Sequence, residues 1–232
     1  MSQTAGETAA RKELAARTVI ALRPIAGPLA LGFFGLAAAT FVTSGLQLGW
    51  VQPTEAKQVA LCILAFTVPL QFTASLLGFL ARDGVAATGM GLLSGIWAVV
   101  GLVTFTGRPG ETSDALGLFL LLAGIAMWAP ASSAAASKLV PALVLSTAGL
   151  RFLVTGLYQL TSNEIWEDTA GVIGLVLAGF AVYAAYAVEL EDVLQRSVLP
   201  LGRRGEGEMA MKGTYAHQIA NVAHEPGVRQ QL

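Results

Sequence analysis

Six apolar stretches, each close to the length that a helix needs to cross a lipid bilayer, constrain the fold of this chain more than any other feature. The hydrocarbon core of a bilayer is about 30 Å thick, and a helix needs roughly 20 residues to span it. Strands of a membrane barrel would be shorter and would alternate between apolar and polar residues. We therefore predict an all-α integral membrane protein with six transmembrane helices. The predicted spans are residues 27–50, 56–80, 85–106, 115–136, 139–160 and 170–190, joined by short loops, of which the one at 161–169 is acidic.

The amount and distribution of charge support the same class. Charged residues make up only 12% of the chain, against roughly 25% in a typical soluble domain. Charge is sparse at residues 24–190, with 13 charged residues in 167 positions, whereas the 65 positions of the two ends hold 16. The net charge of −1 gives no electrostatic case for a nucleic-acid partner.

The chain divides into three parts. We predict a polar cytoplasmic segment at residues 1–23, a membrane domain at 24–202, and a disordered polar tail at 203–232, where little apolar content is available for burial. Lysine and arginine concentrate in both tails and favour the cytoplasmic side. Because six spans place both termini on one side, we predict cytoplasmic termini in a multi-pass protein of the plasma membrane, with the lipid bilayer around it.

Small residues recur at helical spacing in two of the spans. Lipid gives helices no hydrophobic drive to associate, so faces of small residues form close helix–helix seams. The seams lie either within one subunit or between subunits. The predicted packing residues are Gly91 and Gly95 in the third span, and Gly171, Gly174 and Ala178 in the sixth.

Two prolines interrupt the apolar pattern. Pro130 lies inside the fourth span, which we therefore expect to be short or kinked. Pro69 frees a carbonyl in the second span, and neighbouring hydroxyls often bond such groups. Gln71 follows it, and is either a helix–helix hydrogen-bonding group or a substrate-binding residue.

The first span begins with a proline-rich lead-in. A helix that starts near Pro28 and Leu29 has free amides in its first turn, and such an end attracts anions. Phe34 lies one turn further on, where an aromatic ring can narrow a path. This helix either lines a route through the membrane or is an ordinary lipid-facing span.

Arg151 is a charge near the centre of the fifth predicted span. A charge at that depth costs at least about 2.5–3.5 kcal/mol on insertion scales. Three roles are open to it: it binds a substrate carboxylate, it pairs with a helix-end carbonyl or an acid, or it snorkels to the interface. No acidic residue lies at matching depth in any predicted span, which disfavours an internal salt bridge and a carboxylate relay for protons.

The sequence contains no recognisable set of catalytic or cofactor-binding residues. It has no nucleotide-binding loop, no nucleophile–base set and no metal-ligand cluster, so we predict that the chain is not an enzyme and has no cofactor and no metal. A single cysteine, Cys62, excludes an internal disulfide. His217 and His224 lie in the polar tail, where we expect no metal site.

Three stretches resemble the acetate uptake transporter family, the SatP/YaaH-type succinate–acetate and monocarboxylate transporters. Residues 28–35 are similar to the family's Asn-Pro-Ala-Pro-Leu-Gly-Leu signature and the glycine and phenylalanine after it. The spacing from Gln71 to Trp97 matches the family pattern without a gap. Residues 170–175 and 181–183, followed by Val-Leu-Pro-Leu-Gly at 198–202, resemble the family's ending, the most specific of the three.

The resemblance implies a six-helix protomer that forms a homo-oligomer, commonly a hexamer, with a path for acetate or a similar small carboxylate in each protomer. It also implies uptake linked to protons. The residues of this sequence that correspond to the family's aromatic–aliphatic constriction are Phe34, Leu93 and Ala148.

The sequence departs from the family pattern at several positions. Ile25 replaces the signature asparagine, Leu93 the tyrosine of the third helix, and Gly78 the acid that often ends the second helix. Loss of the asparagine and the tyrosine removes polar contacts that the family's site would use on a carboxylate. Either Arg151 compensates for this loss or the substrate differs.

Three functions therefore compete. The leading hypothesis is a proton-linked transporter for small monocarboxylates, in which the first-helix N-terminus and Arg151 attract the carboxylate. The second is a passive channel for small neutral or weakly acidic solutes. The third is a non-transporting membrane scaffold whose tail recruits another protein.

Overall fold

The computed structural model describes residues 26–81, 83–194, 196–205 and 207–208. The predicted N-terminal segment and most of the predicted tail lie outside these residues. The described chain contains six helical spans long and apolar enough to cross a bilayer, which confirms the predicted fold class. In chain order the elements are α2 (Leu29–Gln47), η1 (Pro53–Glu55), α3 (Ala56–Cys62), η2 (Ile63–Thr67), α4 (Val68–Leu80), α5 (Gly84–Thr106), α6 (Asp114–Ala135), α7 (Leu139–Thr161) and α8 (Glu164–Leu194).

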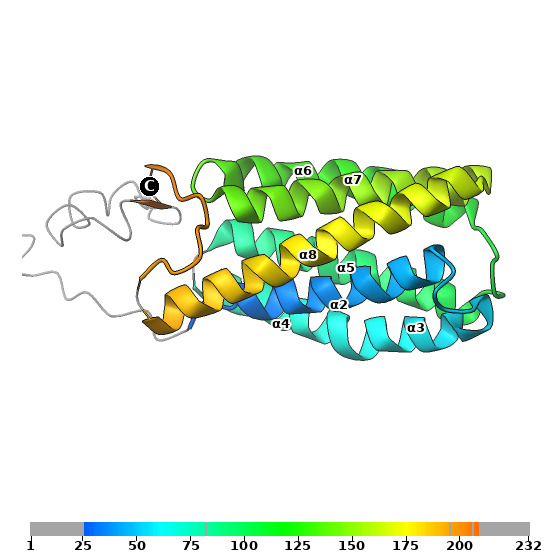
Figure 1. Cartoon of the computed structure of the whole chain (residues 1–232), viewed down its shortest axis with the longest axis horizontal. Helices are drawn as coiled ribbons and strands as arrows, with labels where there is room; N and C mark the ends of the chain where they lie inside the picture. Colours follow the sequence, from blue (N-terminus) through cyan, green and yellow to red (C-terminus); the bar gives the residue numbers. More distant parts are fainter. Residues whose placement is uncertain (1–25, 82, 195, 206, 209–232) are drawn as a thin grey trace, which may run out of the picture.

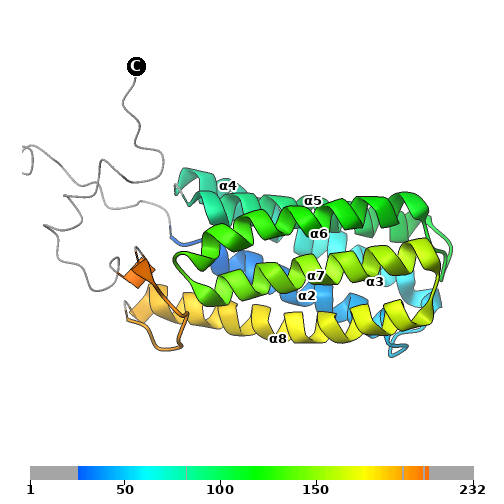
Figure 2. The same cartoon turned by 90° about the horizontal axis from the view of Figure 1, so that it is seen from above.

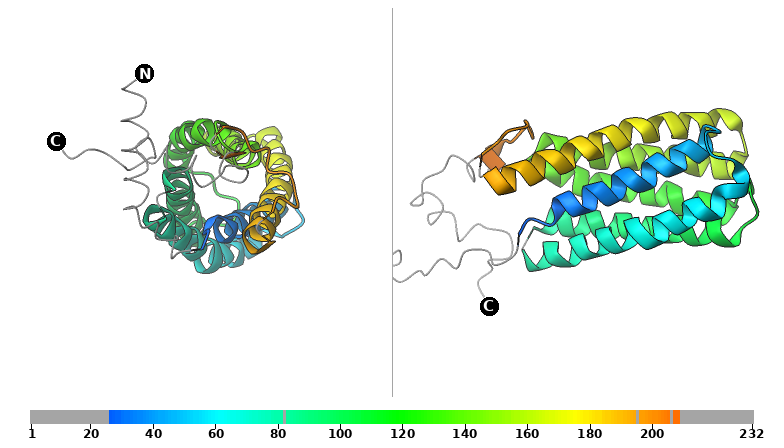
Figure 3. Two further views of the ribbon diagram at one scale, coloured as in Figure 1. Left: turned by 90° about the vertical axis from the view of Figure 1, so that its left-hand side faces the viewer. Right: turned by 60° about the horizontal axis from the view of Figure 1, so that its bottom comes forward.

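The long helices run side by side along the molecule (Figures 1 and 2). Each span packs against its neighbours in the chain, and α8 returns to pack on α2, so that the spans form a closed ring. Figure 3 (left) shows this ring from its end. The described chain enters and leaves the bundle at one end, which we call the proximal end; the opposite end is the distal end.

The second span is one continuous helical run whose middle is widened. The segments α3 and α4 are joined by the π-helical turn η2, which ends two residues before Pro69. Proline has no amide hydrogen, and its ring displaces the carbonyl four residues earlier, so a wider turn accommodates it. The hydroxyl of Thr67 donates to the carbonyl oxygen of Gly35 at 2.9 Å, and thereby ties this turn to α2.

Two helices differ from the expected lengths. Helix α6 continues through Pro130 to Ala135 and is not shortened. Helix α8 begins at Glu164, six residues before the predicted start, because the acidic segment expected to form a loop is helical. Acidic side chains in the first turn favour this start, since they interact well with the positive end of the helix dipole.

Glycine pairs allow α6 and α7 to approach each other most closely. A Cβ on Gly124 would lie 2.7 Å from the carbonyl oxygen of Gly149, and a Cβ on Gly149 would lie 2.8 Å from that of Gly124. Gly117 and Gly156 approach in the same way, two turns closer to the distal end. Any side chain at these positions would push the helices apart.

The predicted packing residues take different places. Gly91 packs on Ser75 of α4, whereas a Cβ on Gly95 would meet no atom within 4 Å, so Gly95 forms no seam inside the protomer. Gly171 and Gly174 face α2, where a Cβ on Gly171 would lie 2.7 Å from Leu48 Cγ. Ala178 is buried on the same helix.

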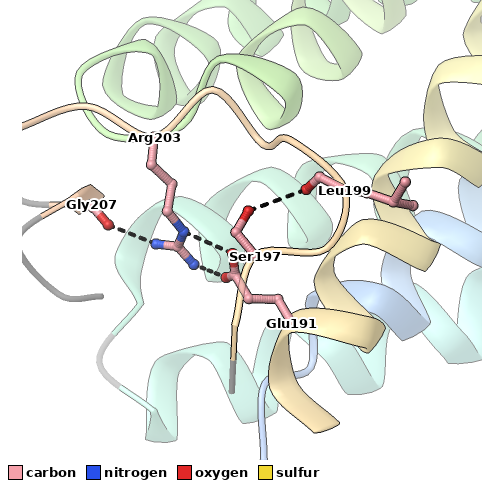
Figure 4. A network of polar contacts seen from close by, with 5 residues as sticks. All are labelled: Glu191, Ser197, Leu199, Arg203 and Gly207. Carbon is pink, nitrogen blue, oxygen red and sulfur yellow. Dashed lines mark hydrogen bonds and ion pairs between the residues drawn. The ribbon is translucent and has the colours of Figure 1, made fainter. Parts of the chain in front are cut away.

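A strap after α8 (residues 197–205) folds back on the proximal end of the bundle. The guanidinium of Arg203 binds both carboxylate oxygens of Glu191 and donates to the carbonyl oxygen of Gly207 at 2.9 Å (Figure 4). The phenol of Tyr183 donates to the carbonyl oxygen of Pro200 at 3.0 Å. The strap is therefore fixed to α8 through side chains from two helical turns.

The strap also caps the first turn of α7. The amides of Leu139 and Val140 donate to the carbonyl oxygens of Gly202 and Leu201, each at 3.1 Å. The first amides of a helix have no partner within it, so these bonds satisfy two of them. The predicted start of a disordered tail at residue 203 is therefore too early, because Arg203 lies in this ordered strap.

Candidate functional site

A cavity of about 430 Å³ lies at the distal end of the ring. We call it the distal cavity. Its walls come from α2, α5, α6 and α7, from the starts of η1 and α3, and from the loop at 107–113, and Glu167 of α8 also lines it. Both polar and apolar side chains line it. Its polar members include Thr43, Gln47, Thr104, Thr155, Tyr158 and Gln159.

Arg151 reaches the distal cavity from the middle of α7, and its side chain is only 2% exposed. Its Nη2 donates to Thr43 Oγ1 at 2.6 Å, to Gln47 Oε1 at 3.1 Å and to Ser44 Oγ at 3.5 Å. All three acceptors lie on the last turns of α2. The side chain points into the ring, so the alternative of snorkelling to the interface does not apply.

The guanidinium is not fully satisfied by these bonds. Nε is buried and has no hydrogen-bond partner, and it lies against Gly174, where a Cβ would be 2.5 Å from it. Because Nη2 makes all of the hydrogen bonds of Arg151 within the described chain, Nη1 remains available to a ligand in the cavity. Gly174 is thus a packing residue that also leaves room for the guanidinium.

Trp97 of α5 lies over the same guanidinium. The Cζ of Arg151 is 5.4 Å from the centroid of the Trp97 ring, a distance at which the ring face attracts a cation. Trp97 in turn meets the ring of Phe152 edge-on, at 5.6 Å between centroids. The floor of the distal cavity is therefore a cation held between an aromatic face and the polar end of α2.

No acidic residue in the described part of the chain forms a salt bridge with Arg151. Arg151 is thus a buried cation whose charge is spread over neutral acceptors. Buried charges in membrane spans are costly and usually serve a ligand, an ion path or a partner. An arrangement of this kind can attract a small anion from the distal end.

A second, smaller cavity of about 70 Å³ lies at the proximal end, and we call it the proximal cavity. It is lined by Leu29 and Phe33 of α2, by the start of α5 and by the turn between α6 and α7. The strap caps the residues that follow this turn, so it fixes one wall of the proximal cavity.

A packed layer separates the two cavities. On α5 the layer lies between Met90, which lines the proximal cavity, and Trp97, which lines the distal one. On α7 it lies between Leu145 and Phe152. Each interval is seven residues, about 10 Å along a helix. Leu93 and Ala148 lie inside these intervals and are fully buried, a position that suits the predicted constriction.

The phenylalanine of the predicted constriction is not in this layer. Phe34 is half-buried and lines neither cavity, and its ring meets that of Tyr186 on α8 edge-on at 5.6 Å. Phe33 is fully buried and lines the proximal cavity instead. Adjacent residues on a helix point about 100° apart, so only one of the two phenylalanines can face the interior.

Gln71 lies between α4 and α2 and lines neither cavity. Its Nε2 is 3.5 Å from the carbonyl oxygen of Gly32, and its Oε1 is buried without a partner. Gln71 therefore lies at a contact between two helices, outside both cavities.

The two groups expected to attract one carboxylate lie on opposite sides of the packed layer. Pro28 and Leu29, at the start of α2, belong to the proximal end, and Leu29 lines the proximal cavity. Arg151 lines the distal cavity. The α2 N-terminus and Arg151 therefore cannot hold the same carboxylate at once.

Sequence reasoning missed the α2 partners of Arg151. Thr43 and Gln47 are four residues apart and lie on one helical face. Two polar residues at this spacing in an apolar span could have predicted a polar site in the interior of the bundle.

The comparison with family models decides the family. The model of the GPR1/FUN34/yaaH family matches residues 12–196, which is more than half of the chain. The chain belongs to the GPR1/FUN34/yaaH family. This membership confirms the resemblance drawn from the sequence, and it supports a membrane transport protein rather than an enzyme.

The fold of this family member is also that of a solved structure described as the bacterial acetate channel SatP. The two share 21% sequence identity with a TM-score of 0.69, over 77% of this chain and 99% of the other. This likeness shows the shared fold. No curated protein sequence gave a significant match to the chain.

Proposed function

We propose that this protein carries small monocarboxylates such as acetate across the membrane, through the centre of each protomer. The path runs from the distal cavity, across the layer that holds Leu93 and Ala148, to the proximal cavity. The observation that carries the proposal is Arg151, a buried cation without an acidic partner in the described chain, at the floor of the larger cavity.

The order of groups along the path suits selection of a small amphiphilic anion. Arg151 attracts the carboxylate, while the narrow apolar layer favours a methyl group over a larger or more strongly hydrated group. Membership in the GPR1/FUN34/yaaH family and the fold shared with an acetate channel support this substrate class. We infer that the proximal end faces the cytoplasm, because lysine and arginine concentrate in the terminal segments.

We infer further that the protein lies in the plasma membrane, assembles as a homo-oligomer such as a hexamer, and links uptake to protons. Gly95 supports assembly, since it is a glycine on an exposed helix face where a Cβ would meet no atom within 4 Å. A passive channel is the second candidate, favoured because the structural neighbour is itself described as an acetate channel.

Uptake of radiolabelled acetate into proteoliposomes tests the proposal. We expect saturable uptake that an inward proton gradient stimulates and that unlabelled acetate competes away. Flux that follows the acetate gradient alone, without saturation or stimulation, would favour the channel. Absence of protein-dependent flux with and without the gradient would contradict both and favour the scaffold hypothesis.

A further inference from the structure

Glu167 is an acidic residue that lines the same cavity as Arg151. It belongs to the first turns of α8, where the sequence predicted a loop, and its side chain is half-buried at the edge of the distal cavity. The two residues come from different helices, with Arg151 at the floor and Glu167 nearer the mouth. An anion that enters from the distal end and reaches Arg151 therefore experiences the electrostatic potential of the Glu167 carboxylate.

The surroundings of Glu167 contain few groups that would neutralise it. The phenol of Tyr158 on α7 interacts with its carboxylate, and Glu164 and Asp168 are acidic neighbours on its own helix. From the loop between α5 and α6, Arg108 and Glu111 also line the cavity, one of each charge. Glu111 accepts a hydrogen bond from the backbone amide of Arg108 at 3.0 Å, so its carboxylate is tied to the backbone of this loop.

An ionised Glu167 and a carboxylate at Arg151 repel each other, and the interaction is strengthened where protein replaces water. A proton on Glu167 removes this repulsion. Thermodynamic linkage makes this effect reciprocal. A bound anion raises the proton affinity of Glu167 by the same factor by which protonation of Glu167 raises the affinity for the anion. The two binding events are then coupled without direct contact between the groups.

We propose that Glu167 takes up the proton that accompanies a carboxylate into the distal cavity. The inference rests on the proposed function and assigns its proton-binding residue. The proton comes from water at the distal mouth, binds a Glu167 carboxylate oxygen, and is released when the substrate leaves. The summed charge of Arg151 and Glu167 is zero in the empty cavity, and it is zero again when carboxylate and proton are both bound.

Acetate binding to the purified full-length protein tests this coupling between about pH 6 and pH 8, where acetate itself stays ionised. Titration calorimetry in two buffers of different ionisation enthalpy gives the number of protons taken up per acetate. We expect net proton uptake in the wild type and a Kd that rises about fivefold or more across this range. In Glu167→Gln we expect no proton uptake and a Kd that stays near the wild-type value at low pH.

Glu55→Gln is the control, because Glu55 is an exposed acid of η1 that does not line the cavity. It should keep the wild-type proton uptake. The proposal is overturned if Glu167→Gln binds acetate with wild-type proton uptake, or if Glu55→Gln loses uptake equally. If Glu167→Gln does not fold, Tyr158→Phe provides the second test, and an unchanged pH dependence of its Kd would count against Glu167. Failure of the wild type to bind or transport acetate at any pH would instead overturn the proposed function.

Discussion

The guanidinium carbon of Arg151 lies 5.4 Å from the ring centroid of Trp97, so a tryptophan of α5 covers the buried cation of α7. A cation–π contact at a desolvated site contributes about 2 kcal/mol. Loss of this contact would free the guanidinium to move away from the cavity. We expect Trp97→Leu to raise the KM for acetate by roughly tenfold, and Trp97→Phe to raise it less, since phenylalanine keeps an aromatic face. Trp128→Phe, at an exposed position, is the control and should leave KM unchanged.

Arg151 itself should be required for saturable uptake. We expect Arg151→Leu to abolish saturation of acetate uptake in proteoliposomes without preventing assembly, because leucine keeps the apolar stem and removes the charge. Lys57 is an exposed cation outside the cavity, and Lys57→Leu should retain uptake. Saturable uptake by Arg151→Leu at the wild-type rate would remove Arg151 from the mechanism.

Gly174 should tolerate no side chain. A Cβ there would lie 2.5 Å from Arg151 Nε and would also clash with the hydroxyl of Ser44. We expect Gly174→Ala to displace the guanidinium and to lower both the melting temperature in detergent and the affinity for acetate. Gly179→Ala, on the same helix in open space, should change neither. Equal effects of the two variants would contradict the packing that we describe.

The buried layer should limit both rate and selectivity. Ala148 is fully buried between the two cavities, so Ala148→Phe should block the path and reduce acetate uptake at least about tenfold, while Leu93→Ala should admit larger carboxylates. Leu102→Ala, on an exposed face of α5, serves as the control. Normal uptake by correctly folded Ala148→Phe would place the path elsewhere.

The Glu191–Arg203 pair should hold the strap on α8. Hydrogen bonds to charged groups contribute about 1.5–3 kcal/mol, and partial exposure of Arg203 places the expected effect near the lower value. We expect Arg203→Glu to expose the strap to limited proteolysis and to lower the melting temperature. The exchanged pair, Glu191→Arg with Arg203→Glu, should restore part of the loss. No difference between the single and exchanged variants would argue against the ion pair.

Much of the fold could be predicted because the bilayer imposes a length on every span. The predicted ends of the spans at residues 56–80 and 139–160 differ from the observed helices by three residues or fewer. The start of α8 was missed because the low hydropathy of Glu164, Glu167 and Asp168 suggested a loop. Acidic residues in fact favour the first turn of a helix. The α6–α7 seam was missed although Gly117 and Gly124, like Gly149 and Gly156, recur every seven residues.

The candidate site could be predicted only in part. Arg151 stood out as a charge in an apolar span, and Leu93 and Ala148 fell in the buried layer. Phe34 did not, because two adjacent phenylalanines give no indication of which one faces the interior. The resemblance to a family likewise could not show that Pro28 and Arg151 lie on opposite sides of a packed layer.

The sequence by itself determined the class, the number of spans and the exceptional position of Arg151, because transfer free energies depend on residue type and run length alone. The tertiary structure decided which groups surround Arg151, that Phe33 rather than Phe34 faces the interior, and that Glu167 shares its cavity. These depend on helix rotation and on contacts between residues far apart in the chain, such as Thr43 with Arg151 and Gly174 with both Ser44 and Arg151. Such contacts arise from the mutual packing of six helices, which no local pattern encodes.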